Sequence, residues 1–356
     1  LRKASKKLPR IKNFMQAVFF EQHGGPEVLK YGDFKDPVVG PNDVLVGVKA
    51  CALNHLDVWV RQGLPGIPIP LPHIPGSDVA GMVLEFGKGV KRFKKGDRVI
   101  VSPGQLSHHV PEALESRDSF SPEFEILGLQ SQGGYAEKVS VHERFVILVS
   151  EKYSFEEWAS LPLASLTAYH MLISRANLKP GETVLVHAAG SGVGSAAIQI
   201  AKFLGATVFT TVGDYKKVAR AKKLGADETI SYQTKDFSEE IKRLTGGKGV
   251  HVIIEHIGPE VWQKNISCLA RGGRLVTCGA TSGPKVELDL RTVYSKQLSI
   301  LGAYMGSFAE LCKVMELAES GKLLPTVDQV FPLKEAADAQ RRMESRQNFG
   351  KIILKI

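Results

Sequence analysis

The feature that most constrains the fold is a regular alternation of apolar runs and helical segments between Glu182 and Met305. The first unit reads TVLVHAA at 183–189 and GVGSAAIQIAKFLG at 192–205, and five further strand-like runs follow it. Strands that are apolar along their whole length and separated by helices are typical of a parallel sheet with helices on both faces. This region therefore predicts a doubly wound α/β domain.

The chain on either side of this region has a different pattern. From Met15 to about residue 150, short β-rich runs alternate with Gly and Pro, and the proline-rich stretch at 63–76 predicts an irregular loop. Ser154 with Glu157 forms a capping box that opens a helix where the pattern changes. The sequence therefore predicts a basic tail at 1–14, a β-rich domain at 15–160, the α/β domain at 161–305, and a segment at 306–356 that returns to the β-rich domain.

Composition limits the partners of the chain. The net charge is +9, but six of the cations and none of the acids lie in residues 1–13, which leaves +3 for the rest. That balance argues against a dedicated nucleic-acid site, and no apolar run is long enough to cross a membrane. The tail fits a solvated extension, a targeting peptide, an alternative-start extension or an expression remnant, with polyanion or anionic-membrane binding as a further alternative. Four cysteines without C-x-x-C spacing predict reduced thiols and a cytoplasmic location.

A glycine-rich turn, AAGSGVG at 188–194, lies between a predicted strand and a predicted helix. In that context a turn can bind a pyrophosphate on the N–H groups of the helix. The strict G-x-G-x-x-G pattern is not met, because the last position counted from Gly190 is Ser195, and a turn that serves only close packing is the alternative. The strand and helix units that follow favour a dinucleotide site.

The choice of cofactor depends on the end of the second strand, where an acidic residue would bind a ribose 2′-hydroxyl and select NAD. Val212 occupies that position, Gly213 opens space, and Lys217 could meet a 2′-phosphate. Asp214 argues the other way, and Lys217 could instead belong to a solvated helix face. The sequence favours NADP(H) over NAD(H).

Motifs along the chain carry a family resemblance: GPEVL at 25–29, ACALNHLDVWVRQG at 50–63, IPGSDVAGMVLEFGKGVKRFKKGDRV at 74–99, the AAGSGVG turn, and FGKIIL at 349–354. The sequence resembles the medium-chain dehydrogenase/reductase superfamily from Met15 to Ile356, most closely the quinone oxidoreductase-like branch and its zinc-containing relatives. The resemblance implies a GroES-like catalytic domain, a Rossmann domain and an active site between them. It also implies a homodimer or a dimer-based tetramer, formed through an edge strand for which QLSILGAYM at 297–305 is the candidate.

The same resemblance implies which residues contact the cofactor. They belong to the glycine-rich turn, to the ends of the following strands, and to the C-terminal motif. The set is Asn54, Thr167, Ser191, Gly192, Val193, Gly194, Gly213, Lys217, Tyr232, Ile257, Gly258, Gly279, Ala280, Gly350 and Lys351.

The zinc ligands of the family fall on positions that cannot bind zinc. The three catalytic ligand positions hold Asn54, Ser77 and Leu163, whereas a catalytic zinc needs three protein donors. The four positions of the structural zinc lobe hold residues without a thiol: Ser107, Val110, Ala113 and Ser121. His108 and His109 adjoin one of these positions, but a surface loop explains them better. The sequence therefore predicts an enzyme without zinc.

The segment NHLDVWVRQG at 54–63 predicts a helix with two separate faces. Asn54, Asp57 and Arg61 share one face, and His55 lies on another. A purely structural role is available, since Asn54 can cap the helix with support from Asp57, and Asp57 can pair with Arg61. The resemblance adds that Asn54 faces the nicotinamide.

Without a metal to polarise an alcohol oxygen, a quinone or an α,β-unsaturated carbonyl is the more suitable hydride acceptor, and a hydrogen-bond donor can suffice. We therefore expect NADPH-dependent reduction of a small apolar quinone or enone. The candidate catalytic residues are Asn54, His55, Asp57, Arg61 and Thr167. Alternatives are an alcohol or aldehyde dehydrogenase, an enoyl-thioester reductase, and a non-catalytic NADPH-binding protein.

Overall fold

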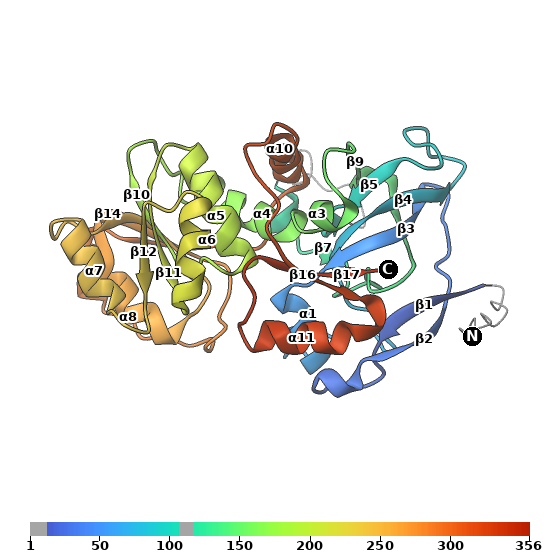
Figure 1. Ribbon diagram of the computed structural model, residues 1–356, viewed down its shortest axis with the longest axis horizontal. Helices are drawn as coiled ribbons and strands as arrows, with labels where there is room; N and C mark the ends of the chain where they lie inside the picture. Colours follow the sequence, from blue (N-terminus) through green and yellow to red (C-terminus); the bar gives the residue numbers. More distant parts are fainter. Residues whose placement is uncertain (1–12, 107–116) are drawn as a thin grey trace, which may run out of the picture.

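A computed structural model describes residues 13–106 and 117–356 and shows two lobes joined side by side (Figure 1). One lobe is built from the middle of the sequence, and the other combines the N-terminal third with the C-terminal segment. Predictions for the basic tail before residue 13, and for Ser107, His108, His109, Val110 and Ala113, lie outside the described residues.

The first lobe holds a parallel sheet of six strands in the order β12-β11-β10-β13-β14-β15. Every neighbouring pair is parallel, which confirms the predicted α/β domain. The order reverses between β10 and β13, the switch point at which sheets of this kind bind ligands. The strands are β10 (Thr183–Val186), β11 (Thr207–Val212), β12 (Glu228–Ser231), β13 (Val250–Glu255), β14 (Leu269–Thr277) and β15 (Ser299–Gly302).

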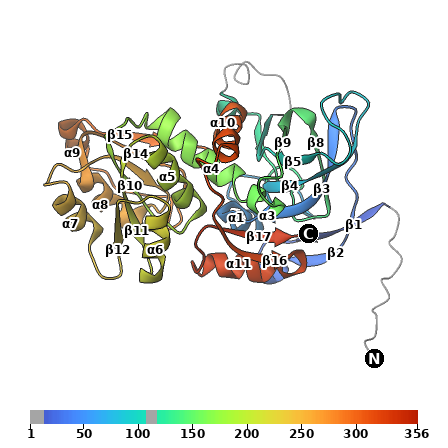
Figure 2. The ribbon, with the colours of Figure 1, turned by 45° about the horizontal axis from the view of Figure 1, so that its top comes forward.

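Helices cover both faces of this sheet (Figure 2). Val184 and Val186 of β10 pack into one buried cluster with Ile198 of the helix after the glycine-rich turn, whereas Leu185 packs on the opposite face with Ile241. A strand buried on both faces explains why the sequence reads as a continuous apolar run. The helices are α5 (Gly192–Phe203), α6 (Val218–Lys223), α7 (Phe237–Leu244), α8 (Pro259–Cys268) and α9 (Leu290–Lys296), with a short turn η5 (Tyr215–Lys217).

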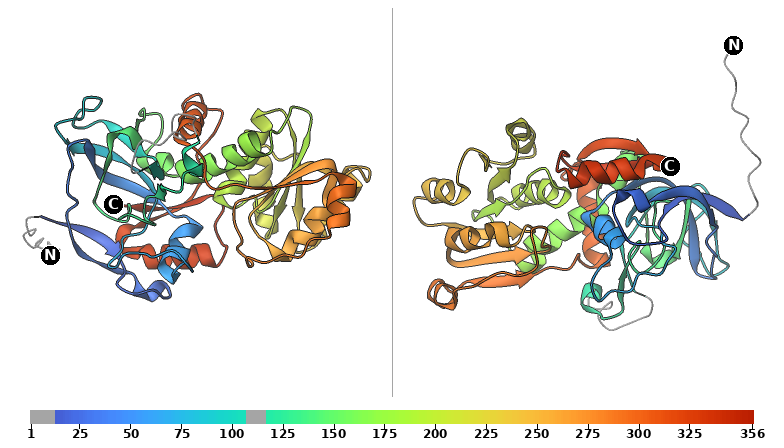
Figure 3. Two further views of the ribbon diagram at one scale, coloured as in Figure 1. Left: turned by 180° about the vertical axis from the view of Figure 1, so that it is seen from behind. Right: turned by 90° about the horizontal axis from the view of Figure 1, so that it is seen from below.

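The second lobe is built around a seven-stranded sheet in the order β16-β17-β3-β4-β5-β9, with β8 also paired to β3. The C-terminal strand β17 pairs antiparallel with β3, so the end of the chain returns to this lobe (Figure 3). Two smaller sheets pair β1 with β2 and β6 with β7. The strands are β1 (Phe14–Phe19), β2 (Lys30–Lys35), β3 (Asp43–Ala52), β4 (Asp78–Phe86), β5 (Arg98–Val101), β6 (Gly104–Leu106), β7 (Phe124–Ile126), β8 (Lys138–His142), β9 (Val146–Leu148), β16 (Val327–Pro332) and β17 (Lys351–Lys355).

Helices pack at the boundary between the lobes and around the second sheet. The predicted capping box of Ser154 and Glu157 is confirmed, although the helix that it opens has only five residues. The helices are α1 (His55–Gln62), α3 (Phe155–Ala159), α4 (Pro162–Tyr169), α10 (Phe308–Glu319) and α11 (Ala336–Glu344). A π-helix, η4 (His170–Arg175), continues α4, and the short turns are η1 (Pro26–Val28), η2 (Asp118–Phe120), η3 (Glu143–Phe145) and η6 (Leu333–Glu335). In the part of the chain that the structure describes, no helix is both long and apolar enough to cross a membrane.

Candidate active site

The glycine-rich turn lies at the end of β10 and starts α5. The Ser191 hydroxyl accepts a hydrogen bond from Gly194 N–H at 2.8 Å and so caps the helix. The other first-turn N–H groups have no carbonyl of the same helix to pair with, so they can bind an anion. His256 Nε2 lies 3.3 Å from Ser191 Oγ and joins this turn to the end of β13.

The ends of β13 and β14 lie beside this turn and are held by one buried carboxylate. Glu255 is completely buried and accepts hydrogen bonds from the backbone N–H groups of Ile257 and Gly258, and from the Thr277 hydroxyl at 2.9 Å. These bonds fix the backbone of 257–258 next to the turn at 278–280. The predicted cofactor residues from three strand ends are thereby brought to one edge of the sheet.

Three of the predicted cofactor residues, Gly213, Lys217 and Tyr232, lie near the end of β11. A Cβ added at Gly213 would lie 2.2 Å from the Tyr232 hydroxyl oxygen, so the hydroxyl can keep this position only beside a glycine. Lys217 Nζ donates to the carbonyls of Arg346 and Asn348, both at 2.8 Å. Lys217 therefore belongs to a contact between the lobes and not to a solvated helix face.

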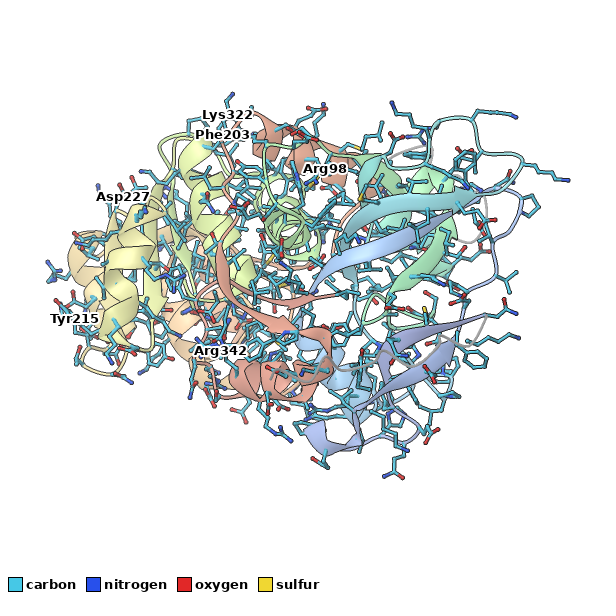
Figure 4. The ribbon with its side chains drawn as sticks, turned by 45° about the vertical axis from the view of Figure 1, so that its right-hand side comes forward. Arg98, Phe203, Tyr215, Asp227, Lys322 and Arg342 are labelled. Atoms are coloured by element: carbon cyan, nitrogen blue, oxygen red, sulfur yellow. The ribbon has the colours of Figure 1, made fainter. Side chains whose placement is uncertain are left out.

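The contact continues along residues 346–351, which we call the crossing segment because it runs from the boundary between the lobes into β17. Gly350 N–H donates to Gly190 O at 2.8 Å, and Arg220 donates to Phe349 O at 3.0 Å. Figure 4 shows Arg342 at the boundary between the lobes, where it bonds Asp328 at 2.8 Å. The crossing segment therefore holds the glycine-rich turn against the second lobe.

Lys351, the last residue of the crossing segment, belongs to a buried polar cluster with Asn54 and Asp78. Its ammonium donates to Asn54 Oδ1 at 2.5 Å and to Asp78 Oδ2 at 3.0 Å, and Asn54 Nδ2 donates to Asp78 at 2.8 Å. The exposed fractions of Asn54, Asp78 and Lys351 are 7%, 0% and 5%. A Cβ added at Gly192 would lie 2.8 Å from Lys351 Cδ, so the lysine stem runs across the start of α5.

The three positions that the family resemblance aligns with zinc ligands converge on this cluster. Asn54 belongs to it, Leu163 N–H donates to Asp78 Oδ1 at 2.7 Å, and Ser77 is the completely buried neighbour of Asp78. Among the described residues, no group of three or more His, Cys, Asp or Glu side chains is arranged to hold a metal ion. An amide, a hydroxyl and an alkyl group beside an ammonium do not fit a zinc ion.

Asp57 lies deep behind Asn54 at the third position of α1. Its Oδ2 accepts Asn54 N–H at 2.8 Å and the Tyr135 hydroxyl at 3.0 Å. Complete burial raises the pKa of Asp57 to about 6, and these hydrogen bonds oppose the rise without cancelling it. Asn54 is the N-cap of α1, as the sequence predicts, with Asp57 returning the supporting hydrogen bond.

The predicted pairing of Asp57 with Arg61 is wrong. Arg61 is completely buried and donates to Gln340 at 2.6 Å, to Glu344 at 2.7 Å and to Gly24 O at 3.1 Å. Two of these partners lie on α11, far away in the sequence, so the helix spacing alone could not indicate them. The geometry gives Arg61 the role of fixing α1 to α11.

Thr167 and His55 differ in what they can offer a ligand. The Thr167 hydroxyl donates to Leu163 O at 2.8 Å, so its oxygen remains available as an acceptor. The His55 ring packs edge-on against Trp59, with ring centroids 5.2 Å apart. Partial desolvation, with repulsion from nearby His256, lowers the pKa of His55, so the imidazole is neutral at pH 7.

A cleft of about 500 Å³ opens at the ends of β13, β14 and β15. Its lining includes Gly258, Gly279 and Ala280 of the predicted set, whereas Asn54, His55 and Thr167 lie outside it. Burial raises the pKa of Cys278, another lining residue, to about 12, which disfavours a nucleophilic thiolate. Three aromatic side chains also line this cleft: Phe120, Trp262 and Tyr304. No sequence signal indicated them, because they come from three distant segments without a shared motif.

The chain matches known protein families and curated relatives. Residues 40–151 match the alcohol dehydrogenase GroES-like domain, and residues 192–320 match the zinc-binding dehydrogenase domain. The chain is 33% identical to quinone oxidoreductase 1 of Escherichia coli, covering 94% of this chain and 98% of that protein. It is 32% identical to human quinone oxidoreductase, covering 96% and 97%.

Solved structures agree with this relationship. The crystal structure of an NAD-dependent alcohol dehydrogenase superposes with a TM-score of 0.93 at 44% identity, covering 96% of this chain and all of that one. A quinone oxidoreductase of Pseudomonas syringae superposes with a TM-score of 0.81 at 34% identity and the same coverage. The fold and the site define a two-domain, NAD(P)-binding oxidoreductase. The chain belongs to the medium-chain dehydrogenase/reductase superfamily and to its quinone oxidoreductase-like branch.

Proposed function

We propose that this enzyme transfers hydride from NADPH to a quinone or an α,β-unsaturated carbonyl without zinc. The observation that carries the proposal is the buried cluster of Asn54, Asp78 and Lys351, because an ammonium and an amide occupy the place where the family resemblance aligns a metal. These groups cannot act as a Lewis acid toward a simple alcohol, whereas a hydrogen-bond donor suffices for an acceptor that is already activated.

The chain's own residues would bind and orient the reactants. The cofactor, when bound, supplies the hydride. The N–H groups at the start of α5 would bind its pyrophosphate, and the residues that end β13 and β14 would hold its nicotinamide half. Asn54 Nδ2 has a second N–H beyond the one given to Asp78, and neutral His55 has an N–H to offer. Either donor could stabilise the oxyanion that develops on the substrate.

Asp57 and Arg61 would act indirectly. Both are completely buried, and Asp57 bonds the backbone of Asn54. We propose that they position α1, and that Thr167 uses its remaining lone pairs to accept a hydrogen bond from the bound cofactor.

NADP(H) is the proposed cofactor. Val212 removes the acid that would select NAD, and Gly213, Tyr232 and Lys217 surround the position of a 2′-phosphate. Lys217 donates to two backbone carbonyls, which leaves one of the three N–H groups of its ammonium for a 2′-phosphate. The 44% identity to an NAD-dependent alcohol dehydrogenase favours the second candidate, an alcohol or aldehyde dehydrogenase that uses NAD.

The domain bounds, the oligomeric state and the cellular location are also proposals. We propose that residues 15–160 with 306–356 form the catalytic domain and residues 161–305 the Rossmann domain. Strand β15 is the outer strand of its sheet, which supports a homodimer formed through it. Four free cysteines, Cys51, Cys268, Cys278 and Cys312, support a reducing, cytoplasmic location.

The test is the loss of reduced-nicotinamide absorbance with NADPH and with NADH over a substrate panel. The panel contains quinones, 2-alkenals, enoyl thioesters, simple aldehydes and simple ketones. Turnover of quinones or enones, faster with NADPH, is the expected result. Turnover of simple aldehydes with NADH would favour the alcohol dehydrogenase, and tight NADPH binding without turnover would favour a non-catalytic binding protein.

A further inference from the structure

His170 is a buried histidine that the proposed reaction leaves without a role. It is the first residue of the π-helix η4 and only 5% exposed, and its ring lines the first cleft together with Gly258 and Gly279 of the proposed nicotinamide site. The ring also lines a second cleft, of about 510 Å³, which is open to solvent. Short π-helical segments within α-helices occur frequently at functional sites. His170 therefore lies where a bound ligand and solvent can both reach it.

One nitrogen of the His170 ring is held by Glu310 on α10. His170 Nδ1 lies 2.9 Å from Glu310 Oε1 and 3.1 Å from Oε2. Glu310 also accepts hydrogen bonds from the Ser174 hydroxyl and from Ser307 N–H, the latter at 2.7 Å. Burial alone would raise the pKa of Glu310, but these hydrogen bonds outweigh it and lower the pKa. Glu310 is therefore ionised, and since a carboxylate can only accept, Nδ1 carries a proton.

The other ring nitrogen, Nε2, is left for a ligand. Within the described residues Nε2 makes no hydrogen bond, and the ring borders both clefts. At the other end of η4, Arg175 Nε donates to the carbonyl of Gly302, a residue of the first cleft, at 2.7 Å. The π-helix is thus fixed at both ends beside the clefts. A histidine held at Nδ1 by a carboxylate, with Nε2 facing a ligand, is a common arrangement for a general acid or base.

We propose that His170 donates the proton that completes the reduction of an α,β-unsaturated carbonyl bound in the first cleft. This inference rests on the proposed function and extends it, because a hydride alone converts such a substrate into an enolate. The substrate gains a C–H bond at its β-carbon, and the electron pair of its C=C bond moves toward the carbonyl oxygen.

The enolate then takes its proton from the His170 imidazolium. The Nε2–H bond breaks, a C–H bond forms at the α-carbon, and the neutral ring regains a proton from water in the second cleft. Glu310 is a positioning residue, since it orients the ring through Nδ1 and stabilises the imidazolium.

The stereochemistry of the product tests the proposal with the full-length enzyme, NADPH and 3-methyl-3-penten-2-one. Reduction makes the α-carbon of this enone a stereocentre. A proton delivered from one side by His170 gives mainly one enantiomer of 3-methyl-2-pentanone, whereas protonation of a released enolate by water gives both equally. Chiral gas chromatography measures the ratio, and we expect one enantiomer in large excess from the wild type.

Variants connect that excess to His170. His170→Asn keeps an N–H near the position of Nδ1 but removes Nε2, so kcat for the enone should fall about a hundredfold with KM little changed, and the product should be nearly racemic. Added imidazole should restore part of kcat. Glu310→Gln can keep the capping box of α10 and should lower kcat about tenfold.

His251→Gln is the matched control. It removes a histidine that bonds Thr183 and lies outside the described lining of both clefts, so it should change neither kcat nor the enantiomer ratio. Urea denaturation of each variant checks that the fold is kept.

A quinone separates this proposal from the proposed function. The oxygen of reduced 1,4-naphthoquinone can take its proton directly from water, so His170→Asn should change kcat for this acceptor less than about threefold. The same enantiomer ratio from the wild type and His170→Asn, a racemic product from the wild type, or turnover of the quinone with none of the enone would overturn His170 as proton donor and leave the reductase activity in place. Failure to turn over either acceptor would overturn the proposed function itself.

Discussion

Lys351 Nζ lies 3.0 Å from Asp78 Oδ2, and both side chains are almost completely buried between the end of the chain and the strand after the proline-rich loop. The pair does more than neutralise two charges, because Asn54 bonds both partners. The lysine stem also crosses the start of α5, so the cluster connects the second lobe to the glycine-rich turn.

Removing the Lys351 ammonium alone should lower the stability of the folded protein. Lys351→Met would leave Asp78 as a buried carboxylate without its cation, and the expected loss is about 3–5 kcal/mol in the free energy of unfolding. Urea denaturation of the wild type and the variant measures it. The double variant Asp78→Asn with Lys351→Met should recover part of the loss, since no uncompensated charge remains. If Lys351→Met unfolds at the same urea concentration as the wild type, this ion pair does not contribute to stability.

Asp57 should make the protein less stable as pH rises from about 4 to 6. Its pKa is raised in the folded state to about 6, so in this range the folded protein binds a proton that the unfolded chain has released. Stability from this group is greatest below pH 4 and reaches a constant lower level above pH 6, a difference on the order of 3 kcal/mol.

Comparison with Asp57→Asn isolates that contribution from the other carboxyl groups. The difference in unfolding free energy between wild type and variant should change over pH 4–6 and be flat above it. Tyr135→Phe removes a hydrogen bond to the charged form and should move the change to higher pH. A difference that is constant across the whole range would contradict the raised pKa.

A side chain at Gly213 should displace the Tyr232 ring, which is half exposed. The Cβ of Gly213→Ala would lie 2.2 Å from the Tyr232 hydroxyl, so the ring must move away from the proposed 2′-phosphate position. NADPH affinity should fall about tenfold or more, whereas NADH affinity should change much less. Isothermal titration with both cofactors measures this.

The Gly213→Ala and Tyr232→Phe double variant serves as the control. Without the hydroxyl, the added Cβ would still lie 2.7 Å from Tyr232 Cζ, so the ring must still move. The double variant also lacks the hydroxyl that is proposed to bind the 2′-phosphate, so NADPH affinity should remain low. Equal loss of NADPH and NADH affinity in the single variant would mean that Gly213 serves the fold and not the recognition of the 2′-phosphate.

The dinucleotide-binding lobe could be predicted well because its signals are local. Buried parallel strands such as β10 are apolar along their whole length, and the turn that caps α5 with Ser191 lies directly after the first of them. The family motifs likewise indicated that Asn54, Gly213 and Lys351 matter. These predictions needed only residues that are close together in the sequence.

The contacts that define the site could not be predicted from the same signals. Asn54 and Lys351 are hydrogen-bonded although they lie 297 positions apart in the sequence. Arg61 pairs with Glu344, 283 positions away, and not with Asp57, which lies one helical turn away. Pairing over such separations depends on how β17 and α11 pack onto α1 and β3, which no local spacing indicates. The importance of Asp78 was missed for the same reason, since its side chain acts through Asn54, Leu163 and Lys351 and not through its sequence neighbours.

The central claim is that hydride transfer in this enzyme needs no metal, because Lys351 and Asn54 occupy the place of one. The most direct measurement is the steady-state rate of NADPH oxidation with a quinone, before and after exhaustive dialysis against a strong chelator, with zinc content measured on both samples. We predict the same kcat and KM for the untreated and the metal-stripped protein, with no gain on adding zinc. Loss of activity on stripping, with recovery on adding zinc, would contradict the account.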